Sequence, residues 1–265
     1  MERVRAAFPF PGYMNYPTGY VTLANAVQRH LPTGSSILDF GCGPCDKTAI
    51  LSAMGYSCAG FDDLQDFWHL ISDNRQKIVR FATDMGIDLT VGDGRCALPY
   101  PCESFDMVIL SDVIEHFHVS PRDQLNDLLA LVKSGGLLFI TVPNAVNIRK
   151  RMAVLRGKTN MPDYAYFYWH PGEWRSHVRE YVRDDLTQLM SYLDLHILEL
   201  STFSQFLFRV PSVLRLAYHV ATTIFPAWRD TWLVIARKPA GWQARRSIPE
   251  DELTRLLGRY NYYAF

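Results

Sequence analysis

Short apolar runs alternate with helical patterns along this chain, and this alternation restricts the fold more than any other feature of the sequence. Runs typical of strands occupy residues 36–40, 57–61, 88–91, 105–110, 137–142, 195–200 and 231–236. Helical patterns lie at 46–54, 64–84, 121–132, 183–192 and 249–257. Strands that alternate with helices build a mostly parallel sheet with helices on both faces. The sequence therefore predicts an α/β fold.

The charge balance and the cysteines exclude several classes of protein. The chain has 27 basic and 27 acidic residues, which argues against a nucleic-acid-binding protein with a broad basic face. The five cysteines all lie within the first 102 residues, and their odd number does not suit a disulfide framework. Cys42 and Cys45 have zinc-site spacing, but no second pair follows, so we expect no metal. The first residues lack the apolar core of a signal peptide, which favours a cytoplasmic protein.

A glycine turn follows the first expected strand. It has the sequence Asp-Phe-Gly-Cys-Gly at residues 39–43, and glycines let a ligand approach the main chain closely. A dinucleotide fingerprint would need a third glycine, but Pro44, Cys45 and Asp46 follow instead, with Asp46 a plausible N-cap of the next helix. Asp62 ends the second strand, where its two carboxylate oxygens can accept both hydroxyls of a ribose. These features predict a nucleotide-like ligand.

Further motifs follow in order: Gly92-Asp93, Leu98-Pro99, Phe105-Asp106, Val113-Ile114-Glu115-His116 and Ser134-Gly135-Gly136. With them, residues 36–144 resemble the class I S-adenosylmethionine (SAM)-dependent methyltransferases of UbiE and UbiG type. The broken glycine pattern and these motifs argue against the alternative of an NAD-dependent oxidoreductase. The resemblance implies SAM as cofactor and a Rossmann-like, seven-stranded, mostly parallel sheet whose last strand is antiparallel.

The resemblance also implies a set of cofactor-binding residues. They are Asp39, Gly41, Cys42, Gly43, Asp62, Asp63, Asp93, Gly94 and Ser111. Asp39, Gly41 and Gly43 would surround the methionyl part, while Asp62 would bind the ribose and Asp93 the adenine amino group. For Asp63 a helix cap or a surface position is the preferred alternative. Cys45 stands where many relatives carry a third glycine.

One domain with elaborations suits the length of 265 residues. Its expected parts are an N-terminal cofactor flap (1–34) with Tyr13, Tyr16 and Tyr20, a SAM-binding core (35–143), an acceptor-side lid (144–182) and an apolar insertion between strands six and seven (201–230). The insertion fits a membrane-contacting amphipathic helix, a homodimer interface or a substrate lid.

The catalytic candidates are His116, His177 and Asp112. Asp112 and His116 follow the fourth strand, where the acceptor should meet the methyl group, and an imidazole is a natural general base. Bracing the loop is the alternative role for His116. The segment 177–181 resembles a "GHxREYT" segment of methyltransferase-like proteins from polysaccharide and natural-product pathways, which would place His177 near the acceptor.

The lid is rich in aromatic and basic residues. Its candidate acceptor-binding residues are Tyr168, Trp169, His170, Arg179 and Tyr181. Aromatic rings and guanidinium groups suit sugars, phosphates or carboxylates, although the same aromatics would also suit the core of a packed lid. We expect methyl transfer to a hydroxyl oxygen of a small molecule, a sugar or polysaccharide precursor or a secondary metabolite, in the cytoplasm or at a membrane surface. The alternatives are a non-catalytic SAM-binding subunit and an N- or C-methyltransferase of quinone or lipid type.

Overall fold

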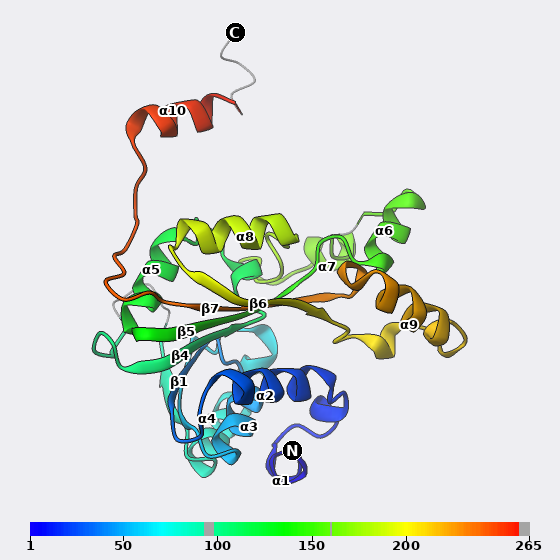
Figure 1. Cartoon of the computed structure of the whole chain (residues 1–265). Coiled ribbons are helices and arrows are strands. Elements are labelled where there is room, and N and C mark those ends of the chain that lie inside the picture. Colours follow the sequence, from blue (N-terminus) through cyan, green and yellow to red (C-terminus); the bar gives the residue numbers. More distant parts are fainter. Residues whose placement is uncertain (93–97, 160, 260–265) are drawn as a thin grey trace.

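The computed structural model contains one mixed sheet of seven strands, and it describes residues 1–92, 98–159 and 161–259. The strand order is β3-β2-β1-β4-β5-β7-β6 (Figure 1). Strands β1 to β5 pair in parallel, and β7 runs antiparallel to both of its neighbours, β5 and β6. The predicted seven-stranded Rossmann-like sheet with an antiparallel last strand is confirmed.

The elements alternate as the sequence indicates. The strands are β1 (Ser36–Phe40), β2 (Ser57–Asp62), β3 (Asp88–Val91), β4 (Phe105–Ser111), β5 (Val132–Pro143), β6 (His196–Phe203) and β7 (Thr231–Arg237). The α-helices are α1 (Glu2–Ala7), α2 (Thr18–His30), α3 (Asp46–Ala53), α4 (Asn74–Asp84), α5 (Arg122–Leu131), α6 (Ile148–Leu155), α7 (Tyr164–Tyr168), α8 (Arg183–Tyr192), α9 (Arg215–Ile224) and α10 (Glu250–Gly258). The 3₁₀ turns are η1 (Tyr13–Asn15), η2 (Phe67–Leu70), η3 (Ile114–His116), η4 (Leu207–Arg209), η5 (Ser212–Leu214) and η6 (Pro226–Trp228).

Helices cover both faces of the sheet, because the central strands are apolar on both sides. Along β4, Val108 and Leu110 belong to the core shared with α5 and α8, whereas Met107 and Ile109 belong to the core shared with α2 and α3. Figure 1 shows α2, α3 and α4 on one side of the sheet and α5 and α8 on the other. Each fully buried aliphatic side chain contributes about 1.5–3 kcal/mol of transfer free energy. This two-sided burial holds the strand ends, which form the site, in a fixed arrangement.

Three local predictions were wrong. The expected helix at 64–84 is instead the short turn η2 and helix α4, because Leu64 and Ser72 adopt left-handed backbone angles that a helix does not tolerate. Strand β5 starts at Val132 rather than 137, since the main chain at Gly135 and Gly136 pairs with that of Lys238, far along the sequence. The N-cap of α3 is Cys45, with φ +62°, and not Asp46.

The two insertions lie at one end of the molecule. Helices α6 and α7 follow β5, and α9 lies between β6 and β7; all three gather at the same side of Figure 1. Helix α10 lies apart from the other elements, and each of its residues is exposed (Figure 1). Within the described ranges, no helix has the length and apolar character needed to traverse a bilayer.

Candidate active site

An open cleft of about 720 Å³ lies at the carboxyl ends of β1, β2 and β4. Small-molecule sites commonly have volumes of about 300–1,000 Å³, and open α/β sheets bind ligands at this edge. The described lining includes Tyr13, Tyr16, Tyr20, Asp39, Gly41, Cys42, Gly43, Lys47, Asp62, Asp63, Trp68, His69, Ser111, Asp112, His116, Trp174, Arg175, Gln205 and Phe206. The structure thus brings most of the predicted cofactor residues and two of the three catalytic candidates into one cavity.

The glycine turn after β1 forms one wall of the cleft. Gly41 has φ +73°, and a Cβ atom added there would lie 2.6 Å from Cγ2 of Val113. Gly43 has φ +51°, and an added Cβ would meet nothing within 4 Å. The first glycine therefore allows the turn to pack against the segment that follows β4. The second leaves the main chain open toward the cleft, as close approach of a ligand requires.

Asp39 lies buried below this turn. The Thr48 hydroxyl donates a hydrogen bond of 2.6 Å to Oδ2 of Asp39. Burial raises the pKa of Asp39 to about 7, although the Thr48 hydrogen bond and the charge of Lys47 act in the opposite direction. A buried carboxyl group of this kind fits a cationic ligand, because a positive charge nearby favours the ionised form.

Asp62, at the end of β2, supports the glycine turn by hydrogen bonds. The main-chain N–H groups of Gly43 and Leu64 donate to its two carboxylate oxygens, at 2.8 and 2.7 Å. Burial raises the pKa of Asp62 to about 6, and these two hydrogen bonds lower it in part. A carboxylate has about four lone-pair positions, so each oxygen keeps the capacity to accept one more hydroxyl. The arrangement fits the ribose of a nucleoside ligand.

We expect cofactor affinity to increase between about pH 5 and pH 8, on the order of tenfold overall. In the free protein the raised pKa values of Asp39 and Asp62 leave both groups partly protonated at low pH. A ligand that donates hydrogen bonds or carries a positive charge favours their ionised forms, so binding releases protons and strengthens as pH rises. Titration calorimetry with S-adenosylhomocysteine (SAH) and with SAM across this range measures the effect. Affinity independent of pH, or a dependence unchanged in Asp62→Asn, would contradict it.

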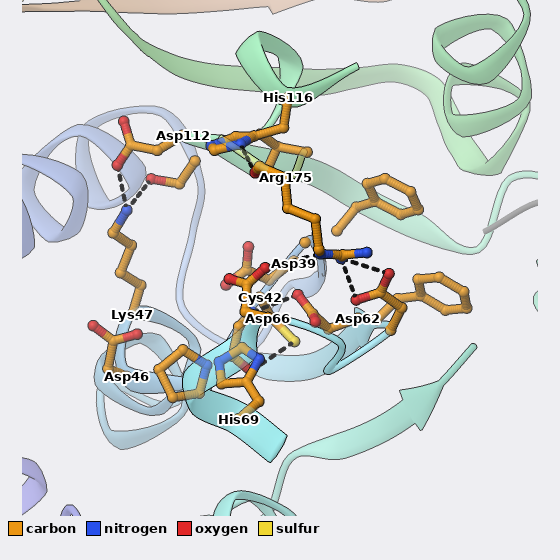
Figure 2. A pocket seen from close by; sticks show the side chains of 18 of the residues that line it. Asp39, Cys42, Asp46, Lys47, Asp62, Asp66, His69, Asp112, His116 and Arg175 are labelled. Carbon is orange, nitrogen blue, oxygen red and sulfur yellow. Dashed lines mark hydrogen bonds and ion pairs between the residues drawn. The ribbon is translucent and has the colours of Figure 1, made fainter. Parts of the chain in front are cut away.

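Lys47 and Asp112 form an ion pair inside the cleft. Lys47 Nζ lies 2.8 Å from Asp112 Oδ2 and 2.7 Å from the Ser111 hydroxyl oxygen, and Figure 2 shows the two charged side chains pointing toward each other. Burial alone would raise the pKa of Asp112, but the charge and hydrogen bond of Lys47 hold it below its usual value. Asp112 also has a left-handed backbone, with φ +60°. An ionised, paired carboxylate suits a positioning role better than that of a base.

His116, in the segment that follows β4, packs its ring against the ring of His177. Their rings meet edge to face with centroids 5.0 Å apart. His116 Nδ1 lies 2.8 Å from the main-chain oxygen of Arg175, and His177 Nδ1 lies 2.9 Å from Glu180 Oε1. Both partners only accept, so each Nδ1 carries a proton, and in the neutral form of each ring Nε2 holds the lone pair. His116 lines the cleft, and the described lining does not include His177.

Glu115 is fully buried beneath the two imidazoles. Its Oε1 lies 3.9 Å from His116 Nε2 and 4.0 Å from His177 Nε2, and neither of its carboxyl oxygens has a hydrogen-bond partner among the described residues. Burial raises the pKa of Glu115 well above its usual range. Burial also lowers the pKa of His177 to about 4, helped by the charges of His116 and Lys150. Both effects remove charge from this buried cluster.

Among the described residues, Glu115, His116 and His177 form a group that could bind one metal ion together. One donor atom of each, from Glu115, His116 and His177, lies within 4.8 Å of the others. Two imidazoles and one carboxylate, with each Nδ1 held by a second partner, are a common ligand set for divalent metals. The cysteine pair considered in the sequence is different, because Cys42 and Cys45 are buried free thiols with sulfurs 3.7 Å apart. That the chain binds no metal stays a prediction.

Arg175 closes one side of the cleft. Its guanidinium lies 2.7 Å from Asp63 Oδ2 and 3.2 Å from Asp66 Oδ1, while its main-chain oxygen is held by His116. Figure 2 shows this side chain stretched over the cleft. The segment around Arg175 is thereby fixed to the loop after β2. Asp63, predicted to bind the cofactor, has both oxygens engaged by Arg175.

The predicted acceptor-binding residues lie elsewhere. The described lining of the cleft includes none of Tyr168, Trp169, His170, Arg179 and Tyr181. Tyr168 and Trp169 point to solvent, Arg179 pairs with Asp185, and Tyr181 is buried with its hydroxyl near the main-chain oxygen of Ile114. Asp93 and Gly94 fall outside the described residues, so their predicted roles are not addressed by the structure.

Sequence reasoning missed several lining residues. Lys47 stands in the first turn of α3, where the helix dipole disfavours a cation, and this mismatch could have indicated a buried partner. Trp174 and Arg175 come from the lid, and Gln205 and Phe206 come from the insertion between β6 and β7. Nothing local in the sequence separates these residues from their neighbours, because long-range packing selects them.

Comparisons with known proteins agree with this geometry. A family model described as a methyltransferase domain matches residues 19–200. The mitochondrial ubiquinone biosynthesis O-methyltransferase of Homo sapiens is 27% identical over 137 residues, which cover 50% of this chain and 36% of that protein. The match therefore spans only about a third of that relative's length.

Solved structures share the fold at low identity. SAM-dependent methyltransferases from Aquifex aeolicus and Archaeoglobus fulgidus both give a TM-score of 0.54, at 11% and 14% identity, with 89% and 85% of this chain and 97% of each of those chains covered. The [4+2]-cyclase SpnF gives 0.55 at 17% identity, with 84% of this chain and 81% of that one covered. The last likeness shows that the same fold also supports another activity.

Proposed function

The chain belongs to the methyltransferase-domain family, and on that premise we propose that it transfers the methyl group of SAM to a hydroxyl oxygen of a small-molecule acceptor. SAM supplies a methyl group that is electrophilic because it is bonded to a sulfonium. The residues that fit SAM are Asp39 and the glycine turn for its methionyl part and Asp62 for its ribose. A hydroxyl acceptor must lose its proton, so the protein has to provide a base near the acceptor.

The observation that carries the proposal is the orientation of His116. Its Nδ1 lies 2.8 Å from the main-chain oxygen of Arg175, so in the neutral ring Nδ1–H donates and Nε2 holds the lone pair, on a side chain that lines the cleft. The glycine turn packs against Val113, so the cofactor wall and the segment carrying His116 are neighbours. We assign His116 Nε2 the role of accepting the acceptor's proton. His177, held by Glu180, packs against the ring of His116 and orients it.

The charge of the cleft favours a neutral acceptor. Its described lining carries seven carboxyl groups, at Asp39, Asp46, Asp62, Asp63, Asp66, Asp112 and Glu173, against the two cations Lys47 and Arg175. Both cations are already paired with carboxylates. A phosphate or carboxylate on the acceptor would meet mainly like charge, whereas hydroxyl groups can donate to these oxygens. A polyhydroxylated molecule such as a sugar, which could stack on Trp174, fits this lining.

The direct test is transfer of an isotope-labelled methyl group. The protein is incubated with methyl-labelled SAM and a set of neutral sugars, sugar derivatives and phenols, and the products are separated and located by mass spectrometry. We expect label on an oxygen atom of a neutral hydroxylated compound. Label on nitrogen or carbon would contradict the acceptor assignment. SAM binding by calorimetry without transfer to any compound would favour a non-catalytic SAM-binding subunit.

A further inference from the structure

Helix α9 buries only two of its residues and exposes an aliphatic stripe, whereas a helix that covers a core turns its apolar face inward. Tyr218 and Thr222 are buried, and the Tyr218 hydroxyl lies 3.0 Å from the Ser204 hydroxyl oxygen. The exposed stripe consists of Leu216, Val220 and Ile224, spaced four residues apart and therefore on one face. Leu216 is 75% exposed. No described residue covers this stripe, although such an aliphatic surface is costly to leave in water.

A second exposed apolar surface lies at the same end of the molecule. Leu155 at the end of α6 and Trp169 just after α7 are 78% and 77% exposed, and every residue of α7 is exposed. Figure 1 shows α6, α7 and α9 at one side. The Asn144 side-chain amide donates to the main-chain oxygens of Ala227 and Arg229, at 2.7 and 2.8 Å. These bonds join the start of the segment that carries α6 and α7 to the end of the segment that carries α9.

The described parts of the two segments, residues 144–159, 161–172 and 203–229, are together called the basic apolar face. They carry eight Lys or Arg residues and one acidic residue, Asp163, whereas the whole chain has 27 of each sign. Arg149 and Lys150 pair with Asp230 and Glu180, which lie outside the two segments. The exposed cations beside the apolar side chains are Arg151, Arg156, Lys158, Arg209 and Arg215, and the rest of the chain is net negative. Anionic lipid headgroups attract such charge, aliphatic side chains insert at the acyl boundary, and Trp and Tyr rings favour the interface.

We propose that the basic apolar face docks this protein on membranes that contain anionic lipids. The excess of basic side chains selects anionic headgroups, and the α9 stripe supplies the apolar insertion. Phe206 and Phe208 line the cleft within the same segment, so docking holds the cleft entrance near the lipid surface. The outward-facing Tyr168 and Trp169, which do not reach the cleft, contact the headgroup region. The docking does not depend on the proposed methyl transfer.

The test is sedimentation of the full chain with vesicles of phosphatidylcholine alone and of phosphatidylcholine mixed with phosphatidylglycerol. We expect binding to the mixed vesicles, weakening as salt is added, and little binding to phosphatidylcholine alone. The double variant Leu216→Glu/Val220→Glu is expected to lower the partition coefficient on the order of a hundredfold, because two apolar side chains no longer insert. Arg156→Gln/Lys158→Gln is expected to weaken binding to the mixed vesicles only.

The matched control is Val21→Glu/Val79→Glu, which places the same charges at exposed valines of α2 and α4, 43% and 41% exposed against 49% for Val220. It should bind the mixed vesicles as the unaltered protein does. SAH affinity and thermal unfolding verify that each variant is folded. Absence of binding to the mixed vesicles, or equal loss in the control, would overturn the proposal. So would a dimer, seen by light scattering, that Leu216→Glu/Val220→Glu separates, because the face would then join two copies.

Discussion

Replacing His116 by Asn is expected to lower turnover by about a hundredfold to ten-thousandfold, the usual contribution of a positioned general base. The Asn amide can still donate to the main-chain oxygen of Arg175, the contact that His116 Nδ1 makes at 2.8 Å. It offers no nitrogen lone pair in place of Nε2, so only the proton-accepting function is lost. Turnover measured with labelled SAM and SAH affinity measured by calorimetry separate the two effects. The affinity should stay within about threefold of the original value, because His116 is assigned to the acceptor.

His177→Asn is the comparison variant. His177 is not among the described lining of the cleft, so the variant should lose turnover only through looser orientation of His116, by about tenfold or less. A loss as large in His177→Asn as in His116→Asn would mean that the two imidazoles act together. Treatment with EDTA should then be examined. Activity that disappears with the chelator and returns with a divalent cation would assign Glu115, His116 and His177 to a metal and would contradict the base assignment.

That the residues expected at the cofactor lie together could be predicted from the sequence, because the determinants of their positions are local. A strand that ends in a glycine turn fixes where the main chain is open, and the next strand ends at the same edge of a parallel sheet. Asp39, Gly41, Gly43 and Asp62 therefore meet in the structure as expected. The structure adds that Asp62 also supports the turn, through the N–H of Gly43. That contact depends on the register between β1 and β2, which cannot be read from the sequence.

Which residues of the lid line the cleft could not be predicted, because composition does not say which face of a segment turns inward. The lid is aromatic along its whole length, yet Trp174 faces the cleft while Trp169 faces solvent. The inward face is selected by contacts far apart in sequence, such as Arg175 with Asp63. The insertion between β6 and β7 shows the same limit. Its apolar character is plain in the sequence, but the outward direction of Leu216 follows only from the burial of Tyr218 and Thr222.

Replacing Asp62 by Ala is expected to weaken SAH and SAM binding on the order of a hundredfold or more. The carboxylate is assigned to both ribose hydroxyls, and a hydrogen bond to a charged group contributes about 1.5–3 kcal/mol. The substitution also removes the acceptor of the Gly43 and Leu64 N–H groups, so the glycine turn loses its support on this side. Both effects weaken binding, and calorimetry with SAH measures their sum. Thermal unfolding without ligand reports the part that is due to the turn alone.

Asp63→Ala is the matched control, because it removes the neighbouring carboxylate and leaves the Asp62 contacts in place. Asp63 pairs with Arg175, so its loss should loosen the segment over the cleft but change SAH affinity by no more than about threefold. Asp62→Asn should bind with intermediate affinity, since one amide oxygen can still accept a hydroxyl. If Asp62→Ala binds SAH as tightly as the unaltered protein, the ribose is held elsewhere. If Asp63→Ala shows the larger loss, the ribose is bound by Asp63, and the pairing with Arg175 must open when the ligand enters.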